Sequence, residues 1–354
     1  MKLRNIVIPV VATVIALVIG AVVIAALGLD PWLAYQSMLQ GAFGSVYGFT
    51  NTLAKATPLI FTGLSFALAK KTGLLNIGAE GQLYMGGLCG VLVAAYVHGL
   101  PMIVHLPLAV LAGFAGGGAW GLLAGWLKVR FGSSEIITTV MLNYIAIFFI
   151  AYMVNGPITE PPGNLPQSRP LLPTATFPVL IPNTQLHLGF AIAILMAILY
   201  YVFLRHTRKG YEARVVGMNP GAASYAGINK NRLTYLVMFL AGGLGGLAGT
   251  SEILGIQHRL FQGFSPGYGY DGIAVALLGF NSPIGVVLAA LLFGALRSGG
   301  DMMQMVAKVP LAIIYVIQAL VIIFVAAEYL FRRLGNFKPR RQKALKGAGR
   351  RESI

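Results

Sequence analysis

Charged residues are scarce in this chain. Asp, Glu, Lys and Arg make up 10% of its 354 residues, whereas a soluble domain carries about 25%. Hydrophobic residues make up 57%, and the mean hydropathy is +0.76. Several apolar runs approach or exceed the roughly 18 residues that are typical of a membrane-spanning helix. The composition therefore excludes an ordinary soluble domain and indicates an integral membrane protein.

Cysteine is almost absent too. Cys89 is the single cysteine, which excludes an internal disulfide and offers no cysteine cluster for a metal. The sequence has no P-loop, no dinucleotide fingerprint and no His/Cys arrangement for nucleophilic catalysis. The stretches "GLSFALAKKTG" and "GFSPGYGYDG" supply Ser and Asp, but no spacing pairs them as nucleophile and base. We therefore expect neither an enzyme nor a metal site.

The formal net charge of +16 has a particular distribution. Lys and Arg cluster beside the ends of apolar runs, as the positive-inside rule requires of cytoplasmic loops. These clusters are Lys2/Arg4, Lys70/Lys71, Lys128/Arg130, the run 205–232 and the tail from Arg332. The pattern argues against nucleic-acid binding and suits anionic lipid headgroups. It predicts a multi-pass protein with both termini in the cytoplasm.

The apolar runs predict an all-α fold of about ten transmembrane segments. They are 6–28, 52–69, 82–99, 107–127, 136–154, 188–204, 233–254, 271–281, 284–297 and 310–331. The first run is read as a retained helix because it is too long for a signal peptide. The split at 281–283 keeps the basic tail in the cytoplasm, and its two short pieces are candidates for broken or re-entrant helices.

These runs define one transmembrane domain, 1–331, followed by a basic tail, 332–354, that is predicted to lie in the cytoplasm. Within the domain, the Pro-rich segment 155–187 is predicted to lie outside the cell as an ordered or semi-ordered cap. The segment 205–232 is predicted to be a cytoplasmic loop because it is rich in basic residues.

A possible internal repeat links two glycine-rich motifs. "GAEG" at 78–81 resembles "GYDG" at 269–272, and "LLAGWLKVRFGSSE" at 122–135 resembles "LLFGALRSGGD" at 291–301. The predicted topology puts the two copies on opposite sides of the membrane, as an inverted repeat requires, and transporters place substrate paths between such repeats. Chance similarity between short glycine-rich strings is the alternative.

Four acidic residues near or within apolar runs call for explanation: Glu80, Glu135, Glu252 and Asp271. An ionised carboxylate at the bilayer centre costs about 2.5–3.5 kcal/mol on insertion scales, so it normally faces protein or water. Glu80 either lines or gates a pathway, or caps the helix that starts near Gln82. Capping is favoured for Glu135, and both roles remain open for Asp271. Asn143, two turns beyond Glu135 on roughly the same face, is a candidate polar pore contact.

The basic segment after residue 205 contains helix-forming pieces interrupted by "GMNPG". Asn219 followed by Pro220 favours a helix start, and a short helix is predicted over 221–225, ending near Gly227. A short cytoplasmic helix between two membrane spans can dock into a groove of another protein. The alternative is a solvated loop.

Four blocks of this sequence resemble the permease subunits of bacterial ABC importers. They are "GLLNIGAEGQLYMGG", "SSEIITTVMLNYIA", "GYEARVVGMNPGAASYAGIN" and "GYDGIAVALLGFNSPIGVVLAALLFGAL". The resemblance covers about residues 50–330. It is to the branched-chain amino acid/ribose-type permease superfamily, particularly its nucleoside or simple-sugar branch.

The resemblance implies about ten helices in the bacterial inner membrane and a second homologous permease subunit. It further implies two cytoplasmic ATPase subunits that hold ATP-Mg, and an extracytoplasmic substrate-binding lipoprotein. This chain itself would bind no cofactor and catalyse no reaction. The segment 210–227 resembles the loop that couples such permeases to their ATPases. Its characteristic positions are Arg214, Gly217, Asn219, Ala222, Ala223 and Gly227.

The hypothesis is that ATP-driven alternating access carries a nucleoside or a related simple sugar inward. A polar, uncharged substrate needs hydrogen-bonding side chains and aromatic faces. The candidate pathway residues are Asn76, Glu80, Gln82, Tyr84, Asn143 and Asp271. Alternatives are an ABC permease for ribose-type sugars or branched-chain amino acids, an ion-coupled secondary transporter that uses Glu80 and Asp271, and a membrane scaffold.

Overall fold

The computed structural model describes residues 4–163, 165–310, 312–320 and 323. Within these residues the fold is helical, and extended backbone pairing is limited to isolated bridges. The all-α prediction is therefore confirmed. The basic tail 332–354 and half of the last predicted span, 310–331, lie outside the described residues, and residues 312–320 of that span are helical.

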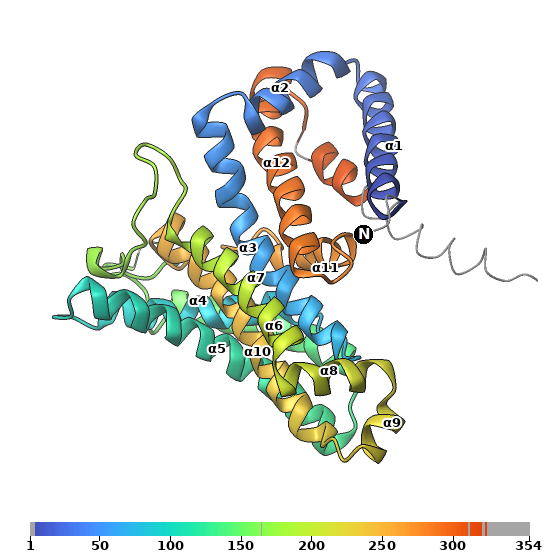
Figure 1. Cartoon of the computed structure of the whole chain (residues 1–354). Helices are drawn as coiled ribbons and strands as arrows, with labels where there is room; N and C mark the ends of the chain where they lie inside the picture. Colours follow the sequence, from blue (N-terminus) through green and yellow to red (C-terminus); the bar gives the residue numbers. More distant parts are fainter. Residues whose placement is uncertain (1–3, 164, 311, 321–322, 324–354) are drawn as a thin grey trace, which may run out of the picture.

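Twelve α-helices are labelled in Figure 1, and the described residues 312–320 are helical as well. They are α1 (Arg4–Ala26), α2 (Pro31–Phe43), α3 (Val46–Lys71), α4 (Ala79–Tyr96), α5 (Met102–Phe131), α6 (Glu135–Asn155), α7 (Leu188–His206), α8 (Arg208–Met218), α9 (Pro220–Tyr225), α10 (Lys230–Glu252), α11 (Tyr268–Leu278) and α12 (Pro283–Ala307). A π-helical turn, Ile253–Gln257, continues α10. Six helices are long and apolar enough to cross a membrane: α3, α5, α6, α7, α10 with its π-turn, and α12.

The structure differs from the sequence prediction in one additional helix and in the length of another. Helix α2 lies in a stretch for which no helix was predicted, and α12 runs to Ala307 rather than stopping near residue 297. Asp30 starts α2 because its carboxylate accepts hydrogen bonds from two backbone N–H groups of the first turn. Helix α12 continues because its small residues Gly299 and Gly300 are buried and allow close packing rather than ending the helix.

The predicted break at 281–283 is confirmed. Phe280 and Asn281 adopt positive φ angles of 53° and 52°, which ends α11. Ser282 then caps α12 by accepting a hydrogen bond from Gly285 N at 3.1 Å, and Pro283 occupies the first helical turn. The backbone therefore breaks here into two separate helices.

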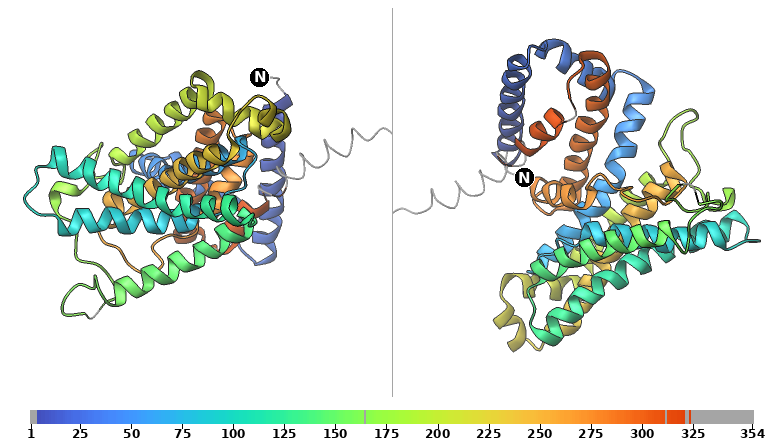
Figure 2. Two further views of the ribbon diagram at one scale, coloured as in Figure 1. Left: turned by 90° about the horizontal axis from the view of Figure 1, so that it is seen from below. Right: turned by 180° about the vertical axis from the view of Figure 1, so that it is seen from behind.

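Helices α4, α5 and α10 pack closely and lie away from α1 (Figure 2). Their contact surfaces are rich in glycine. A Cβ on Gly117 of α5 would lie 2.5 Å from both Gly242 O and Gly246 Cα of α10. Gly113 and Gly121, one helical turn to either side of Gly117, meet the same helix. Backbones can approach this closely only where side chains are absent, which explains why this apolar sequence holds 45 glycines.

The Pro-rich segment 155–187 is ordered by backbone hydrogen bonds to the loop after α10 and to the end of α4. Ser168 N donates to Leu260 O at 2.8 Å, and Phe177 N donates to Leu254 O at 2.9 Å. Leu172 N donates to Ala94 O at 3.0 Å. The described residues of this segment, called the cap below, are therefore ordered, and their position outside the cell stays a prediction.

The cap contains a buried histidine whose titration should affect stability. His187 accepts a hydrogen bond from Gly189 N at 3.1 Å and stacks on Phe177, with ring centroids 5.6 Å apart. Burial, with a smaller contribution from His258, lowers the pKa of His187 to about 4. Between pH 6.5 and pH 4, His187 is protonated in the unfolded chain but stays neutral in the folded chain. The free energy of unfolding therefore falls as the pH falls from 6.5 towards 4.

We expect acidification from pH 7 to pH 4 to destabilise the cap by up to about 3 kcal/mol. Hydrogen exchange in the segment 168–187 should report this loosening. His187→Asn keeps a side chain that can cap the helix but does not titrate, so this variant should lose most of the pH dependence. An equal pH dependence in the variant would rule out His187 as its source.

Candidate substrate pathway and coupling surface

The N-termini of α4 and α11 meet inside the protein, which brings the motifs at 78–81 and 269–272 together. Gly269 N, in the first turn of α11, donates a hydrogen bond of 2.7 Å to the carboxylate of Glu80, in the first turn of α4. A Cβ on Gly269 would overlap the backbone of Glu80. The carboxylate is 2% exposed and lies at the positive ends of both helices, where an anion is stabilised.

Asn143 of α6 holds the chain at the start of α4. Its side-chain oxygen accepts from Gly81 N at 2.8 Å, and its Nδ2 donates to Ile77 O at 2.9 Å. A longer contact of 3.4 Å joins Nδ2 to the Tyr270 hydroxyl. One amide therefore satisfies a donor and an acceptor of the interrupted backbone, which would otherwise be costly to bury.

Asn76 and Gln82 form a reciprocal amide pair at the same place. Asn76 Nδ2 donates to Gln82 Oε1, and Gln82 Nε2 donates to Asn76 Oδ1, both at 3.0 Å. Gly78 N also donates to Asn76 Oδ1 at 3.0 Å. Tyr84, two residues beyond Gln82 along α4, packs against Phe264, with ring centroids 4.7 Å apart. The structure thus brings together five predicted pathway residues, Asn76, Glu80, Gln82, Tyr84 and Asn143, as a buried and hydrogen-bonded support for the broken helices.

Asp271, the sixth predicted pathway residue, points elsewhere. Its carboxylate pairs with the Arg297 guanidinium of α12 at 2.5 Å, and that guanidinium lies 4.7 Å from the centroid of the Tyr268 ring. A second ion pair, Lys55–Asp301, joins α3 to α12. Ionisable side chains on membrane helices face protein or water rather than lipid. These two pairs therefore mark an interior or wet face of α3, α11 and α12.

Sequence reasoning missed Lys55, Arg297 and Asp301. The sequence signal was weak, because Lys55 lies near the start and Arg297 at the end of a predicted apolar run, where basic residues are common. Their partners could not be identified, since Lys55 and Asp301 are 246 positions apart. Only the packing of α3 against α12 brings them together.

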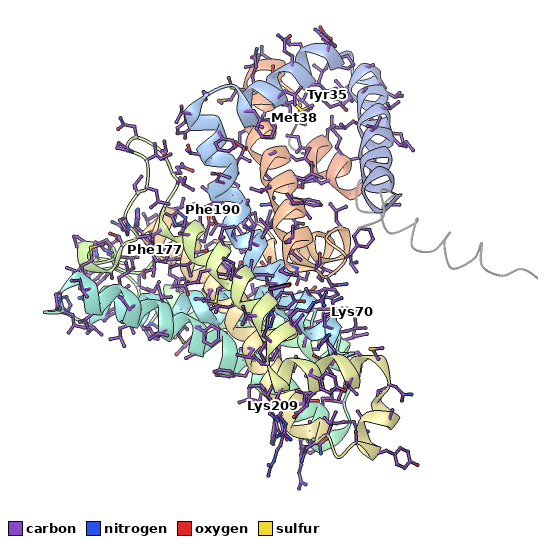
Figure 3. All side chains as sticks on the ribbon, viewed as in Figure 1. Tyr35, Met38, Lys70, Phe177, Phe190 and Lys209 are labelled. Atoms are coloured by element: carbon purple, nitrogen blue, oxygen red, sulfur yellow. The ribbon has the colours of Figure 1, made fainter. Side chains whose placement is uncertain are left out.

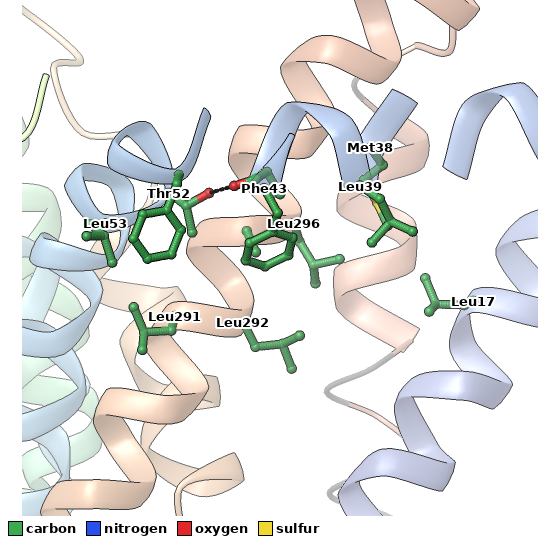
Figure 4. Close-up of a pocket in the computed structure, with 12 residues that line it drawn as sticks. Leu17, Met38, Leu39, Phe43, Thr52, Leu53, Leu291, Leu292 and Leu296 are labelled. Atoms are coloured by element: carbon green, nitrogen blue, oxygen red, sulfur yellow. Dashed lines mark hydrogen bonds between the residues drawn. The ribbon is translucent and has the colours of Figure 1, made fainter. Parts of the chain in front are cut away.

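An apolar pocket of about 320 Å³ lies among α1, α2, α3 and α12 (Figure 4). Its lining is aliphatic and aromatic apart from Thr52, whose hydroxyl donates to Ala42 O at 3.0 Å. Among the described residues, the lining offers a polar solute no free hydrogen-bonding group. The pocket also contains none of the predicted pathway residues. It is therefore unsuited to bind a polar substrate.

The short helix predicted over 221–225 is present as α9, and its position in the cytoplasm stays a prediction. The side chain of Asn219 accepts hydrogen bonds from Gly221 N at 3.0 Å and Ala222 N at 3.1 Å, and Pro220 begins the helix. Gly227, with a φ of 72°, follows the end of the helix. Lys70 and Lys209 lie towards the end of the molecule that carries α8 and α9, in agreement with one basic face (Figure 3).

The helices α8 and α9 are fixed to the membrane domain on one side and exposed on the other. Ala223 is fully buried, and a Cβ on Gly217 would overlap the Lys71 carbonyl at the end of α3. The guanidinium of Arg214 lies 5.9 Å from the Tyr211 ring centroid, and Ala222 is exposed. Met218 and Tyr225, which sequence reasoning did not select, are 86% and 97% exposed. Such an apolar surface on a polar loop suits a protein partner.

Comparison with known proteins gives a consistent result. Residues 48–326 match the family described as "Branched-chain amino acid transport system / permease component". A guanosine ABC transporter permease from Bacillus subtilis is 37% identical over 335 residues, which cover 94% of this chain and 96% of the relative.

Two further relatives have similar coverage. A glucose ABC transporter permease from Haloferax volcanii is 38% identical, over 92% of this chain and 88% of the relative. A nucleoside ABC transporter permease from Lactococcus lactis subsp. cremoris is 36% identical, over 93% of each chain.

Proposed function

The chain belongs to the branched-chain amino acid transport system permease family, and from this premise we propose that its substrate is a nucleoside or a related simple sugar. It is the permease subunit of an ABC transporter and not an enzyme, and ATP hydrolysis takes place in partner chains. The observation that carries the substrate proposal is the close similarity to permeases named for guanosine, nucleosides and glucose.

The proposed architecture has about ten transmembrane segments arranged as an inverted repeat, with both termini in the cytoplasm of a bacterial cell. Two features support the repeat. Helices α4 and α5 carry the first copies of the repeated motifs, and α11 and α12 carry the second copies. Helix α3, which precedes the first copies, packs against α11 and α12, and α10, which precedes the second copies, packs against α4 and α5. The two contacts are therefore equivalent. The motifs at 78–81 and 269–272 also meet through Glu80 and Gly269.

The proposed assembly contains a second homologous permease, two cytoplasmic ATPases and an extracytoplasmic substrate-binding lipoprotein. The exposed face of α8 and α9 would dock into an ATPase, and the positions proposed to transmit its movement are those of the coupling loop. These are Arg214, Gly217, Asn219, Ala222, Ala223 and Gly227. ATP binding would shift the helices around the pathway between inward- and outward-facing states.

Purification of the tagged chain from its native membrane tests this assembly. We expect a second permease, an ATPase and a receptor lipoprotein to copurify, and ATP hydrolysis in liposomes to rise when the receptor is loaded with guanosine or glucose. Copurification without an ATPase would argue against the coupling role. Stimulation by leucine, but by neither guanosine nor glucose, would argue against the proposed substrate class.

The role of the buried polar cluster in transport is also a proposal, and variants of Glu80 can test it. We expect Glu80→Ala and Asn76→Ala to lower uptake while leaving assembly with the ATPase intact. Glu80→Gln retains an oxygen that can accept from Gly269 N, so it removes the charge and keeps the hydrogen bond.

Uptake and the amount of folded protein should be measured for each variant. Low uptake in Glu80→Gln at normal protein levels would assign a pathway role to the charge. Normal uptake in Glu80→Ala and Asn76→Ala would contradict a pathway role for both residues.

A further inference from the structure

A carboxylate at the end of α10 has an unused hydrogen-bonding oxygen. Glu252 is 6% exposed, and its Oε1 accepts a hydrogen bond of 3.1 Å from Gln257 Nε2. Among the described residues, its Oε2 has no hydrogen-bond partner. A buried acid in a membrane helix is costly and usually serves a function, so the free oxygen indicates a missing partner.

The pairing of Glu252 with Gln257 depends on the π-helical turn over Ile253–Gln257. In a regular α-helix, residues five positions apart point about 140° away from each other. The π-turn closes its hydrogen bonds between residues five apart, which aligns these two side chains. Such turns occur frequently at functional sites. The local backbone therefore builds a two-residue polar surface that a continuous α-helix would not form.

Two other buried polar atoms nearby are also free. Gln257 Oε1 and Arg297 Nε have no hydrogen-bond partner among the described residues. Gln257 is held in place because its Nε2 also donates to Phe264 O at 3.0 Å. Arg297 is held by its ion pair with Asp271 and lies within electrostatic range of Glu252. The three side chains thus offer two free acceptors, Glu252 Oε2 and Gln257 Oε1, and one free donor, Arg297 Nε.

The acids of this region differ in their partners. Asp271 pairs with Arg297, and Asp301 pairs with Lys55. Glu80 and Glu252 have no ion-pair partner among the described residues, but Glu80 accepts from Gly269 N, whereas Glu252 keeps one oxygen without any hydrogen bond. Hydroxyl groups can satisfy its free oxygen without carrying charge. A ring with neighbouring hydroxyls could donate to Glu252 and Gln257 at once and accept from Arg297.

We propose that Glu252 and Gln257 bind neighbouring ring hydroxyls of the transported nucleoside or sugar, beside an Arg297 positioned by Asp271. This inference rests on the proposed substrate class and adds the group by which the permease recognises it. Neighbouring hydroxyls are shared by the ribose of guanosine and by glucose. Phe177 N donates to Leu254 O in the same π-turn, so the cap lies directly beside the site.

Thiol protection tests the binding directly. The single cysteine allows a Cys89→Ala background carrying Ser265→Cys, next to Phe264, whose carbonyl accepts from Gln257, and labelling by a small thiol reagent is followed in the purified complex. We expect guanosine to slow the labelling and 2′,3′-dideoxyguanosine to leave it unchanged. Equal protection by both compounds, or by neither, would overturn hydroxyl recognition. Protection by sodium ions alone would assign the site to a cation instead.

Uptake supplies the second readout. Glu252→Gln keeps the size of the side chain but loses a charged acceptor, and we expect guanosine uptake to fall about tenfold or more. Glu135→Gln is the matched control, since this acid pairs with Lys128 in another part of the protein, and its uptake should remain near wild type. Receptor-stimulated ATP hydrolysis shows that each variant is assembled.

The outcomes separate the two proposals. Wild-type uptake in Glu252→Gln, in a chain that carries guanosine or glucose, would overturn the inference and leave the proposed function standing. A wild-type complex that carries neither compound would overturn the proposed substrate class and, with it, the hydroxyl assignment.

Discussion

Gly117→Leu should nearly abolish the accumulation of folded protein in the membrane. Any side chain at this position begins 2.5 Å from Gly242 O and Gly246 Cα, and both atoms belong to the backbone of α10. The backbone cannot turn aside as a flexible side chain does, so α5 and α10 must separate. Overpacking of a well-packed interior typically costs about 1–3 kcal/mol, and we expect the upper end because the obstructing atoms are backbone.

The measurement is the amount and the thermal unfolding temperature of the purified protein. Gly156→Ala is a suitable control, because a Cβ there would approach only Tyr152 O, at 3.3 Å, among the described atoms. The control should behave like the wild type. A Gly117→Leu protein with normal yield and unfolding temperature would show that α5 and α10 do not pack as described.

Tyr225→Arg should abolish substrate uptake without reducing the amount of folded protein. The Tyr225 side chain is 97% exposed on α9, so its replacement leaves the packing of this chain unchanged. Tyrosines at the centre of protein interfaces often contribute about 2 kcal/mol or more to binding. If α9 docks into an ATPase, the substitution should weaken that complex by tenfold or more.

Binding of the purified ATPase and ATP-dependent uptake should be measured together. Met218→Arg, at the other exposed apolar position, should have the same effect. Arg208→Ala changes an equally exposed residue at the start of α8, whose ion pair is with Glu212 of the same helix, and it should retain both activities. Normal ATPase binding by Tyr225→Arg and Met218→Arg would mean that the partner docks elsewhere.

Local signals were sufficient to predict several elements. Asn219-Pro220 predicted the start of α9 because a side-chain cap and a proline act within one helical turn. The break at 281–283 followed from the count of crossings and the basic tail, and the structure shows its local cause in two positive φ angles. Hydrophobic run length predicted most helices because burial in lipid depends on composition over a window rather than on particular partners.

Features that depend on distant contacts could not be predicted. The capping interpretation of Glu80 considered the start of α4 alone, but its carboxylate also accepts from α11, 189 positions away. The π-turn beside Glu252 has no sequence signature comparable to a proline or glycine break. The Asp271–Arg297 pair likewise required the packing of α11 on α12. Sequence pattern therefore located the polar positions, and tertiary packing determined their partners.

Uptake of labelled guanosine into liposomes that contain the purified complex tests ATP-driven transport most directly. The receptor is added outside, ATP and Mg²⁺ are enclosed with the ATPases, and ionophores collapse the proton and sodium gradients. We predict accumulation that requires enclosed ATP, is unaffected by the ionophores and is lost in Tyr225→Arg. Accumulation driven by a proton or sodium gradient, in liposomes that contain this chain without any ATPase, would contradict the coupling mechanism.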